Sequence, residues 1–365
     1  MTVTPFAIDI PQHDLDDLRD RLARTRRPPR TEHSWERGTS TDALETLVAH
    51  WAGVYDWRAT EARFNRLDQV SVEVEGLTVH AVLAGTPGAT PLLLLHGWPD
   101  GFFRFEKALP LLAERFELVI PSIPGYGFSQ RPDEPTGPVR AGDVLAALMT
   151  ALGHERFGVD GGDIGSTIAE QLTLGQPDRV IGLHLGDIPF HRPRALTPEE
   201  MTDEDTEWMS RLMRWEQTEG AYARLQRTKP QTLAVALEDS PAGLAAWILE
   251  KYRAWSDCEG DPFTRFTLDE LSTVLTVYWA TRTAGSSVHY YFDNAHSRLR
   301  TARVEVPTAL AQFPKDLVPG PRSSAERWFR VERFTQFPAG GHFGPWEEPE
   351  LWAGDVVAFF DEVGG

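Results

Sequence analysis

The stretch RFGVDGGDIGS, residues 156–166, joins a short apolar run to a helical segment and decides how the chain folds. Within it, Gly161-Gly162-Asp163-Ile164-Gly165 puts a carboxylate on a turn from a strand into a helix, where Ser is more usual. Small residues on both sides of Asp163 allow a strained turn that holds its side chain above the sheet. We therefore predict that Asp163 is a nucleophile. The alternative is a plain helix N-cap, a role for which Asp is favoured.

Further apolar runs separated by helical segments lie on both sides of this turn. They span residues 91–99, 116–125, 180–189, 303–314 and 327–343. Strands that are apolar throughout are buried on both faces, and their alternation with helices is typical of a mostly parallel sheet in an α/β fold. Ahead of them, QVSVEVEGLTVHAVLAG alternates apolar and polar residues around Gly76, which predicts an antiparallel hairpin.

Two segments depart from this alternation. Residues 1–68 are charged and mostly helical in pattern, and residues 190–300 are helical, rich in Trp and without a buried-strand run. We expect 1–68 to form an N-terminal extension that wraps the core and the cap. We expect 69–189 and 301–365 to form the core, with 190–300 as a helical cap over the carboxyl edge of the sheet, where open α/β sheets bind ligands.

Composition excludes several classes of protein. The chain has 365 residues and a formal net charge of −18, which disfavours a nucleic-acid binder. The single cysteine, Cys258, excludes an internal disulfide and a Cys-cluster metal site, and no His pair has ligand spacing beside a carboxylate. No apolar run approaches the roughly 20 residues of a membrane span, and the N-terminus lacks a signal-peptide pattern. These features predict a cytoplasmic globular protein without metal or membrane anchor.

The segment His96-Gly97-Trp98-Pro99 directly follows the apolar run PLLLL. A turn of this kind supplies a backbone N–H, here from Trp98, which would form an oxyanion hole together with the N–H of Ile164. We expect His96 and Pro99 to border the substrate pocket. On its own, the same segment is also typical of a simple tight turn with Gly and Pro.

A base and an orienting acid are expected later in the chain. His342 lies in Gly340-Gly341-His342-Phe343, after the last apolar run, and its place fits the nucleophile–acid–His order of α/β-hydrolases. Two acids could orient its ring: Asp316, which follows one apolar run, and Asp187, which ends another. Chain order alone does not separate these two candidates.

Taken together, these motifs resemble those of the microsomal-type epoxide hydrolases, an α/β-hydrolase family with an N-terminal extension. The similar stretches, in order along nearly the whole chain, are TPFAIDIPQHDLDDLRDRLARTRRPP, HGWPDGFFRFEKALPLL, IPSIPGYGFSQRP, GGDIGS, GAYARLQRTKPQTLAVALEDSPAGLAAWILEKYRAW, VPTALAQFPKD and FPAGGHFGPWEEPE. The resemblance implies Asp163 as nucleophile, His342 as general base and Asp316 as relay acid. It also implies Tyr222 and Tyr291 as cap tyrosines that donate hydrogen bonds to the epoxide oxygen.

The chemistry of the two tyrosines agrees with that implied role. A phenol with a pKa near 10 stays protonated at pH 7 and can donate to the alkoxide that forms as an epoxide opens. The alternative is that both rings are aromatic filler in a Trp-rich cap, and Tyr290 is easily confused with its neighbour Tyr291. The chain departs from the family at Ile164, where Trp is usual. We expect no N-terminal anchor of the kind that membrane-bound members carry, and therefore a soluble, bacterial-style member.

The predicted function is hydrolysis of a small-molecule epoxide to a vicinal diol, without a cofactor, through an alkyl ester on Asp163 that water activated by His342 hydrolyses. One alternative is a dehalogenase acting on haloalkanes, which shares the Asp nucleophile. Another is a catalytically silent binding protein with a hydrolase fold. The sequence leaves the identity of the epoxide, and whether the chain forms a homodimer, open.

Overall fold

One nine-stranded sheet forms the centre of the part of the chain described by this computed structural model, residues 2–29 and 31–364. Its order is β1-β2-β3-β5-β4-β6-β7-β8-β9. The strands are β1 Val3–Pro5, β2 Asp68–Val74, β3 Leu77–Gly85, β4 Thr90–Leu95, β5 Phe116–Pro121, β6 Phe157–Gly161, β7 Val180–Leu185, β8 Val304–Gln312 and β9 Phe329–Gln336.

The sheet is parallel from β5 through β4 to β9 and antiparallel from β1 through β3 to β5. This arrangement confirms the predicted α/β fold and the hairpin around Gly76. Leu92–Leu95 of β4 are fully buried, as a central strand covered on both faces requires. The edge strand β1 was not expected, because its three exposed residues carry no alternation of apolar and polar positions that a sequence could show.

Helices cover the sheet in two groups. In one group, α5 (Pro138–Ala151) packs against α6 (Ile164–Gly175), and in the other α4 (Leu109–Leu112) packs against α16 (Pro349–Val363). The helix α5 also contacts β2, whereas α16 contacts β7 and β8. Shorter elements of the core are η1 Phe102–Phe105, α14 Arg322–Trp328 and α15 Gly344–Glu347.

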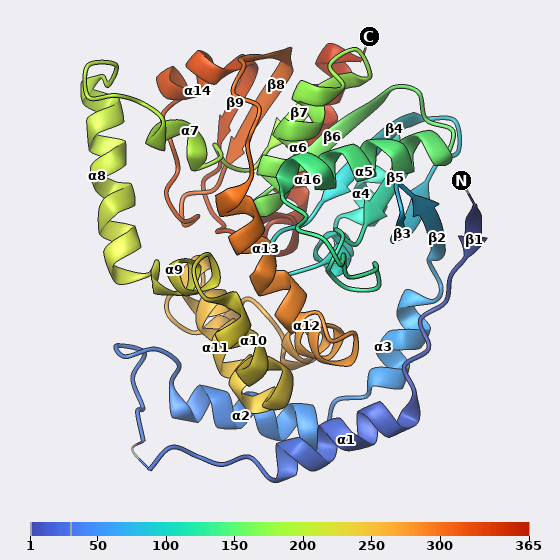
Figure 1. Ribbon diagram of the computed structural model, residues 1–365, viewed down its shortest axis with the longest axis vertical. Coiled ribbons are helices and arrows are strands. Elements are labelled where there is room, and N and C mark those ends of the chain that lie inside the picture. Colours follow the sequence, from blue (N-terminus) through green and yellow to red (C-terminus); the bar gives the residue numbers. More distant parts are fainter. Residues whose placement is uncertain (1, 30, 365) are drawn as a thin grey trace.

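Between β7 and β8, the described residues form only helices and the loops that join them. These helices are α7 His191–Arg194, α8 Asp203–Thr218, α9 Ala221–Gln226, α10 Pro230–Asp239, α11 Pro241–Trp255, η2 Pro262–Thr264, α12 Leu268–Ala280 and α13 Ala284–His296. Figure 1 shows most of these helices at one end of the sheet, with the N-terminal helices on their outer side. Those N-terminal helices are α1 Gln12–Ala23, α2 Thr41–Gly53 and α3 Trp57–Phe64, and both α1 and α2 contact α11 and α12.

A buried charge network joins the strands to α16. His184 on β7 lies between Asp160 on β6 and Asp355 on α16, with ring nitrogens 2.7 and 3.2 Å from the carboxylate oxygens. Arg333 on β9 pairs with the same Asp355 at 2.7 Å. Burial by itself would lower the pKa of His184, but the two carboxylates outweigh it and raise that pKa to about 9. His184 is therefore an imidazolium in the core near neutral pH.

Strand register brings the predicted motifs to one edge of the sheet. Leu95 at the end of β4 pairs with Gly161 at the end of β6, and Gly161 pairs with Leu185 at the end of β7. Leu185 in turn pairs with Leu310 of β8. Because these strands are parallel, the turns that follow them leave the sheet side by side.

Candidate active site

Asp163 sits on a strained turn between β6 and α6. Its φ of 59° and ψ of −127° lie in a region that side-chain-bearing residues rarely adopt, at a cost of about 1–3 kcal/mol. Two glycines make the turn sterically feasible. A Cβ at Gly165 would lie 2.6 Å from the carbonyl oxygens of Leu95 and His96, and a Cβ at Gly97 would lie 2.5 Å from the Cβ of Asp163.

The Asp163 carboxylate faces the site rather than capping its helix. It makes no capping hydrogen bond to α6, so the plain N-cap alternative is wrong. Instead, the backbone N–H of Trp98 donates to Oδ1 at 2.8 Å. The other oxygen, Oδ2, lies 3.5 Å from Nε2 of His342. One carboxylate oxygen is thus held by a backbone donor, and the other lies beside the imidazole.

His342 and Asp316 form a close pair on two neighbouring loops. Nδ1 of His342 lies 2.7 Å from Oδ1 of Asp316, and the backbone N–H of His342 donates to the carbonyl of Trp255 at 2.8 Å. Burial by itself would lower the pKa of His342. The carboxylates of Asp316 and Asp163 outweigh it and hold that pKa well above its usual value. The ring therefore carries a proton while both carboxylates are charged.

Asp187 has a different place from Asp316. Its Oδ1 accepts the backbone N–H of Asp163 at 2.8 Å, and its Oδ2 accepts the hydroxyl of Ser166 at 2.9 Å. Burial, with the nearby charges of Asp316 and Asp163, raises the pKa of Asp187 to about 7. The structure thus brings Asp316 to the imidazole, whereas Asp187 binds the backbone of the nucleophile turn.

Tyr222 on α9 and Tyr291 on α13 meet above the turn. Their ring centroids lie 6.0 Å apart, and both side chains line the same cavity as Asp163. Burial and the charge of Asp163 raise the pKa of Tyr222 well above its usual value, and burial together with Tyr222 does the same for Tyr291. Both phenols therefore stay protonated donors. Tyr290 lies elsewhere, with its ring 6.2 Å from Tyr126 and a different cavity beside it.

The cavity has a volume of about 910 Å³, within the range of small-molecule sites. Its polar lining includes Asp163, Asp316 and His342, and its apolar lining includes Ile164 and Trp215. Among the residues that the structure describes, no group of three His, Cys, Asp or Glu side chains could hold a metal ion. Within the same residues, no helix has the length and apolar character needed to cross a membrane.

His96 and Pro99 do not line this cavity, in contrast to the expectation. His96 is fully buried, and its Nε2 accepts the backbone N–H of Ile123 at 3.0 Å. The carbonyl of Pro99 accepts the hydroxyl of Tyr252 at 3.3 Å. The side chains of His96 and Pro99 thus face the protein interior. Their role is to support the turn that presents the N–H of Trp98.

Sequence reasoning missed the residues that join this turn to the His342 loop. Asp100 accepts the backbone N–H of Gly97 at 2.9 Å and pairs with Arg104 at 2.7 Å, and Arg104 donates to the carbonyl of His342 at 3.3 Å. Asp100 and Arg104 are the only two charged residues in the motif HGWPDGFFRF, and their opposite charges four positions apart could have signalled that they pair in the interior.

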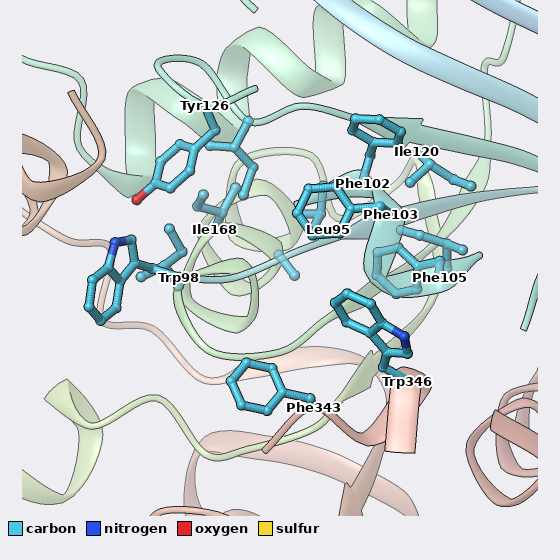
Figure 2. Packing of buried hydrophobic residues seen from close by; sticks show 14 of the residues in the cluster. Leu95, Trp98, Phe102, Phe103, Phe105, Ile120, Tyr126, Ile168, Phe343 and Trp346 are labelled. Atoms are coloured by element: carbon cyan, nitrogen blue, oxygen red, sulfur yellow. The ribbon is translucent and has the colours of Figure 1, made fainter. Parts of the chain in front are cut away.

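Aromatic packing supports the same two segments. Figure 2 shows Leu95 from the end of β4 and Trp98 from the turn after it, together with Phe343 and Trp346 from the segment that follows His342. Glu347 adds a polar support, since its two oxygens accept the backbone N–H groups of Phe343 at 3.0 Å and Asp257 at 2.7 Å. His342 is thereby held both from the core and from the end of α11.

Comparisons with known proteins agree with this arrangement. A family model described as "Epoxide hydrolase N terminus" matches residues 3–105, and one described as "alpha/beta hydrolase fold" matches residues 90–349. Epoxide hydrolase 1 of Sus scrofa is 32% identical over 405 residues, which cover 98% of this chain and 88% of that protein.

Two solved structures are similar over nearly their whole length. An enantioselective mutant of the epoxide hydrolase from Aspergillus niger superposes with a TM-score of 0.88 at 32% identity, covering 100% of this chain and 97% of that one. The juvenile hormone epoxide hydrolase from the silkworm Bombyx mori also gives a TM-score of 0.88, at 28% identity, covering 100% and 95%.

Proposed function

The chain belongs to the epoxide hydrolase family with an N-terminal extension on an α/β-hydrolase fold, and we propose that it opens its epoxide by attack of Asp163. The product is a vicinal diol, formed through an alkyl ester of this side chain. The observation that carries the proposal is the arrangement of the Asp163 carboxylate, with Oδ1 on the N–H of Trp98 and Oδ2 beside His342. A carboxylate held in this way is ready to attack a saturated carbon.

In the first step, Oδ2 of Asp163 forms a bond to one epoxide carbon while the bond from that carbon to the ring oxygen breaks. The electron pair of the broken bond stays on the oxygen, which becomes an alkoxide. Tyr222 and Tyr291 donate hydrogen bonds to this oxygen as its charge develops, the stage at which such donors accelerate a reaction most. The need for two such donors favours an epoxide over a haloalkane as substrate.

In the second step, formation of the ester changes the protonation of His342. The ester has no charge, so one of the two carboxylates that hold the proton on His342 is lost, and the imidazolium can give its proton up to the alkoxide. The neutral ring then accepts a proton from water, whose oxygen attacks the ester carbon. The oxyanion forms at Oδ1, where the N–H of Trp98 stabilises it. Its collapse breaks the bond from the ester carbon to Oδ2, and the departing oxygen takes the proton from His342 to complete the diol. The new carboxyl group of Asp163, which now carries the oxygen from water, returns its proton to the ring.

The helical segment 190–300 is the proposed cap, with 1–68 as the extension around it. Both cap tyrosines come from this segment, whereas Asp163, Asp316 and His342 come from the strand ends beneath it. A substrate in the cavity therefore contacts both parts at once. A location in the cytoplasm and a homodimer stay predictions, which cell fractionation and sedimentation would test.

Isotope labelling tests the covalent route. A single turnover in ¹⁸O water should label Asp163 and leave the diol unlabelled, because the water attacks the enzyme's own carboxyl carbon. His342→Gln should accumulate the ester, seen as a mass increase of the intact protein. Label that enters the diol directly in the first turnover would refute the ester on Asp163.

A further inference from the structure

Lys251 on α11 is a buried cation that the mechanism above does not use. The residue is only 4% exposed, although lysine is almost never fully buried unless it has a partner. Its carboxylate partner is the neighbouring Glu250, whose side chain is 23% exposed. A charge withdrawn from water in this way requires a compensating interaction within the protein.

Besides the carboxylate of Glu250, two aromatic rings of the site interact with this charge. The ammonium nitrogen of Lys251 lies 4.5 Å from the ring centroid of Tyr222 and 5.7 Å from that of Trp255. Cations at such distances from the face of an aromatic ring are attracted by its quadrupole, more strongly when both are desolvated. Lys251 is thus paired with the ring of a proposed epoxide-oxygen donor.

The same ring is fixed by its other neighbours. Tyr222 stacks on Trp98 with centroids 5.3 Å apart and planes 7° apart, and it lies 5.1 Å from the ring of Trp255. Trp98 is the residue whose backbone N–H holds Oδ1 of Asp163. Lys251, Tyr222 and Trp98 are therefore in contact one after the other, and Trp98 connects this group to Asp163.

We propose that Lys251 is a positioning residue for epoxide opening, whose ammonium holds the ring of Tyr222 against Trp98 and polarises its phenol toward the opening oxygen. This inference rests on the proposed function. A cation on the face of a phenol ring draws electron density from it, so the hydroxyl becomes a stronger hydrogen-bond donor.

The direction of charge movement explains why a cation is useful at this point. In the first step, negative charge leaves Asp163 and appears on the epoxide oxygen, next to Tyr222. Among the charged groups that most affect the pKa of Tyr222, the carboxylates of Asp163 and Glu250 oppose charge on its oxygen, whereas the guanidinium of Arg194 favours it. With its nitrogen 4.5 Å from the ring centroid of Tyr222, the ammonium of Lys251 would counter the effect of these carboxylates, and this stabilisation grows as negative charge develops on the epoxide oxygen, which is the condition for acceleration.

The second step should depend on Lys251 much less. Ester hydrolysis uses His342, Asp316 and the N–H of Trp98, and the charge of its transition state develops at Oδ1 of Asp163. Lys251 itself does not line the cavity. The inference therefore separates the two half-reactions, which a general loss of structure would not.

Single-turnover kinetics of three variants test the inference. Lys251→Met removes the charge but keeps a similar length, and it should slow ester formation about 10- to 100-fold with little change in ester hydrolysis. Lys251→Arg keeps a cation and should stay within about fivefold of the wild type. Glu250→Gln is the matched control, because it removes the partner charge and should not slow ester formation.

Two epoxides that open to alkoxides of different basicity provide the second readout. With 1,2-epoxypropane, the loss in Lys251→Met should be large. With its 3,3,3-trifluoro analogue, whose alkoxide is less basic and needs less stabilisation, the loss should shrink. A purely structural role would give equal losses with both substrates, and equal losses would overturn the inference.

The role of Lys251 can also be tested if Lys251→Met is unstable, and two further results would refute it. If Lys251→Met does not fold, Lys251→Gln takes its place in the same measurements, with thermal unfolding to show that the fold is intact. Unchanged ester formation in a folded variant, or an equal loss in Glu250→Gln, would refute the role of Lys251. A wild-type enzyme that forms no ester on Asp163 with an epoxide it hydrolyses would instead refute the proposed mechanism.

Discussion

Replacing Asp187 by asparagine tests the chemistry beneath the nucleophile. Asp187 accepts the N–H of Asp163 through Oδ1 and lies 2.9 Å from the hydroxyl of Ser166 through Oδ2. That hydroxyl also lies 2.6 Å from the carbonyl of Asp163, and its single proton can go to only one of these oxygens. A protonated Asp187 would donate to Ser166, which then donates to the carbonyl. Asparagine can make the same set of hydrogen bonds.

The magnitude follows from the raised pKa of Asp187. An Asp carboxyl with an ordinary pKa of 3.8 and a folded pKa of about 7 retains a proton in the native state over an interval of roughly 3 pH units. Within that interval the unfolded chain binds fewer protons than the folded one, so stability falls as the pH rises from about 4 to about 7 and then levels off. The full loss is at most about 4 kcal/mol.

Asparagine does not titrate, so Asp187→Asn should lack this loss. Urea unfolding of both proteins at pH 4.5, 6, 7 and 8 should show the variant gaining on the wild type by about 3 kcal/mol between the lowest and the highest pH. The matched control is Asp187→Leu, which leaves the N–H of Asp163 without its acceptor and should cost about 1–3 kcal/mol relative to Asn at every pH. A stability difference between Asn and Asp that does not change with pH would refute the reasoning, as would a Leu variant as stable as Asn.

The remaining predictions concern the core, the phenols and the cavity wall. The pKa of His184 is raised to about 9, so its contribution to stability is full below about pH 6.5 and is lost as the pH rises through 9. The stability advantage of the wild type over His184→Gln in urea unfolding should thus shrink by about 3 kcal/mol across this range, and a constant advantage would contradict the buried imidazolium. Tyr222→Phe or Tyr291→Phe should each slow ester formation about 10²-fold in rapid-mixing experiments, with the double variant slower still; a double variant near wild-type rate would eliminate the phenols as donors. Ile164→Trp should narrow the cavity and raise KM for bulky epoxides more than for small ones, and equal changes for both would show that this side chain does not border the substrate.

Much of the fold and site could be predicted because the signals are local. The apolar run before Asp163 and the glycines around it follow from the requirements of a buried strand and a strained turn, both of which act over a few residues. The edge strand β1 could not be predicted, since its residues are exposed and it forms only by pairing with β2. The buried packing of His96 and Pro99 was also hidden, because the sequence does not show which side of a turn faces the cavity.

The sequence by itself determined the α/β architecture, the Asp163 turn and the order of nucleophile, acid and base, because each depends on short-range patterns of burial and backbone conformation. The residue pattern left Asp187 and Asp316 open as partners of the imidazole and the family resemblance implied Asp316, but the contact itself depends on the tertiary structure. Strand register and the loops after β7 and β8 bring Asp316 to His342 and leave Asp187 beneath the backbone of Asp163. It also placed Lys251 against Tyr222, since a contact between two helices of the 190–300 segment depends on their packing and not on the sequence of either one.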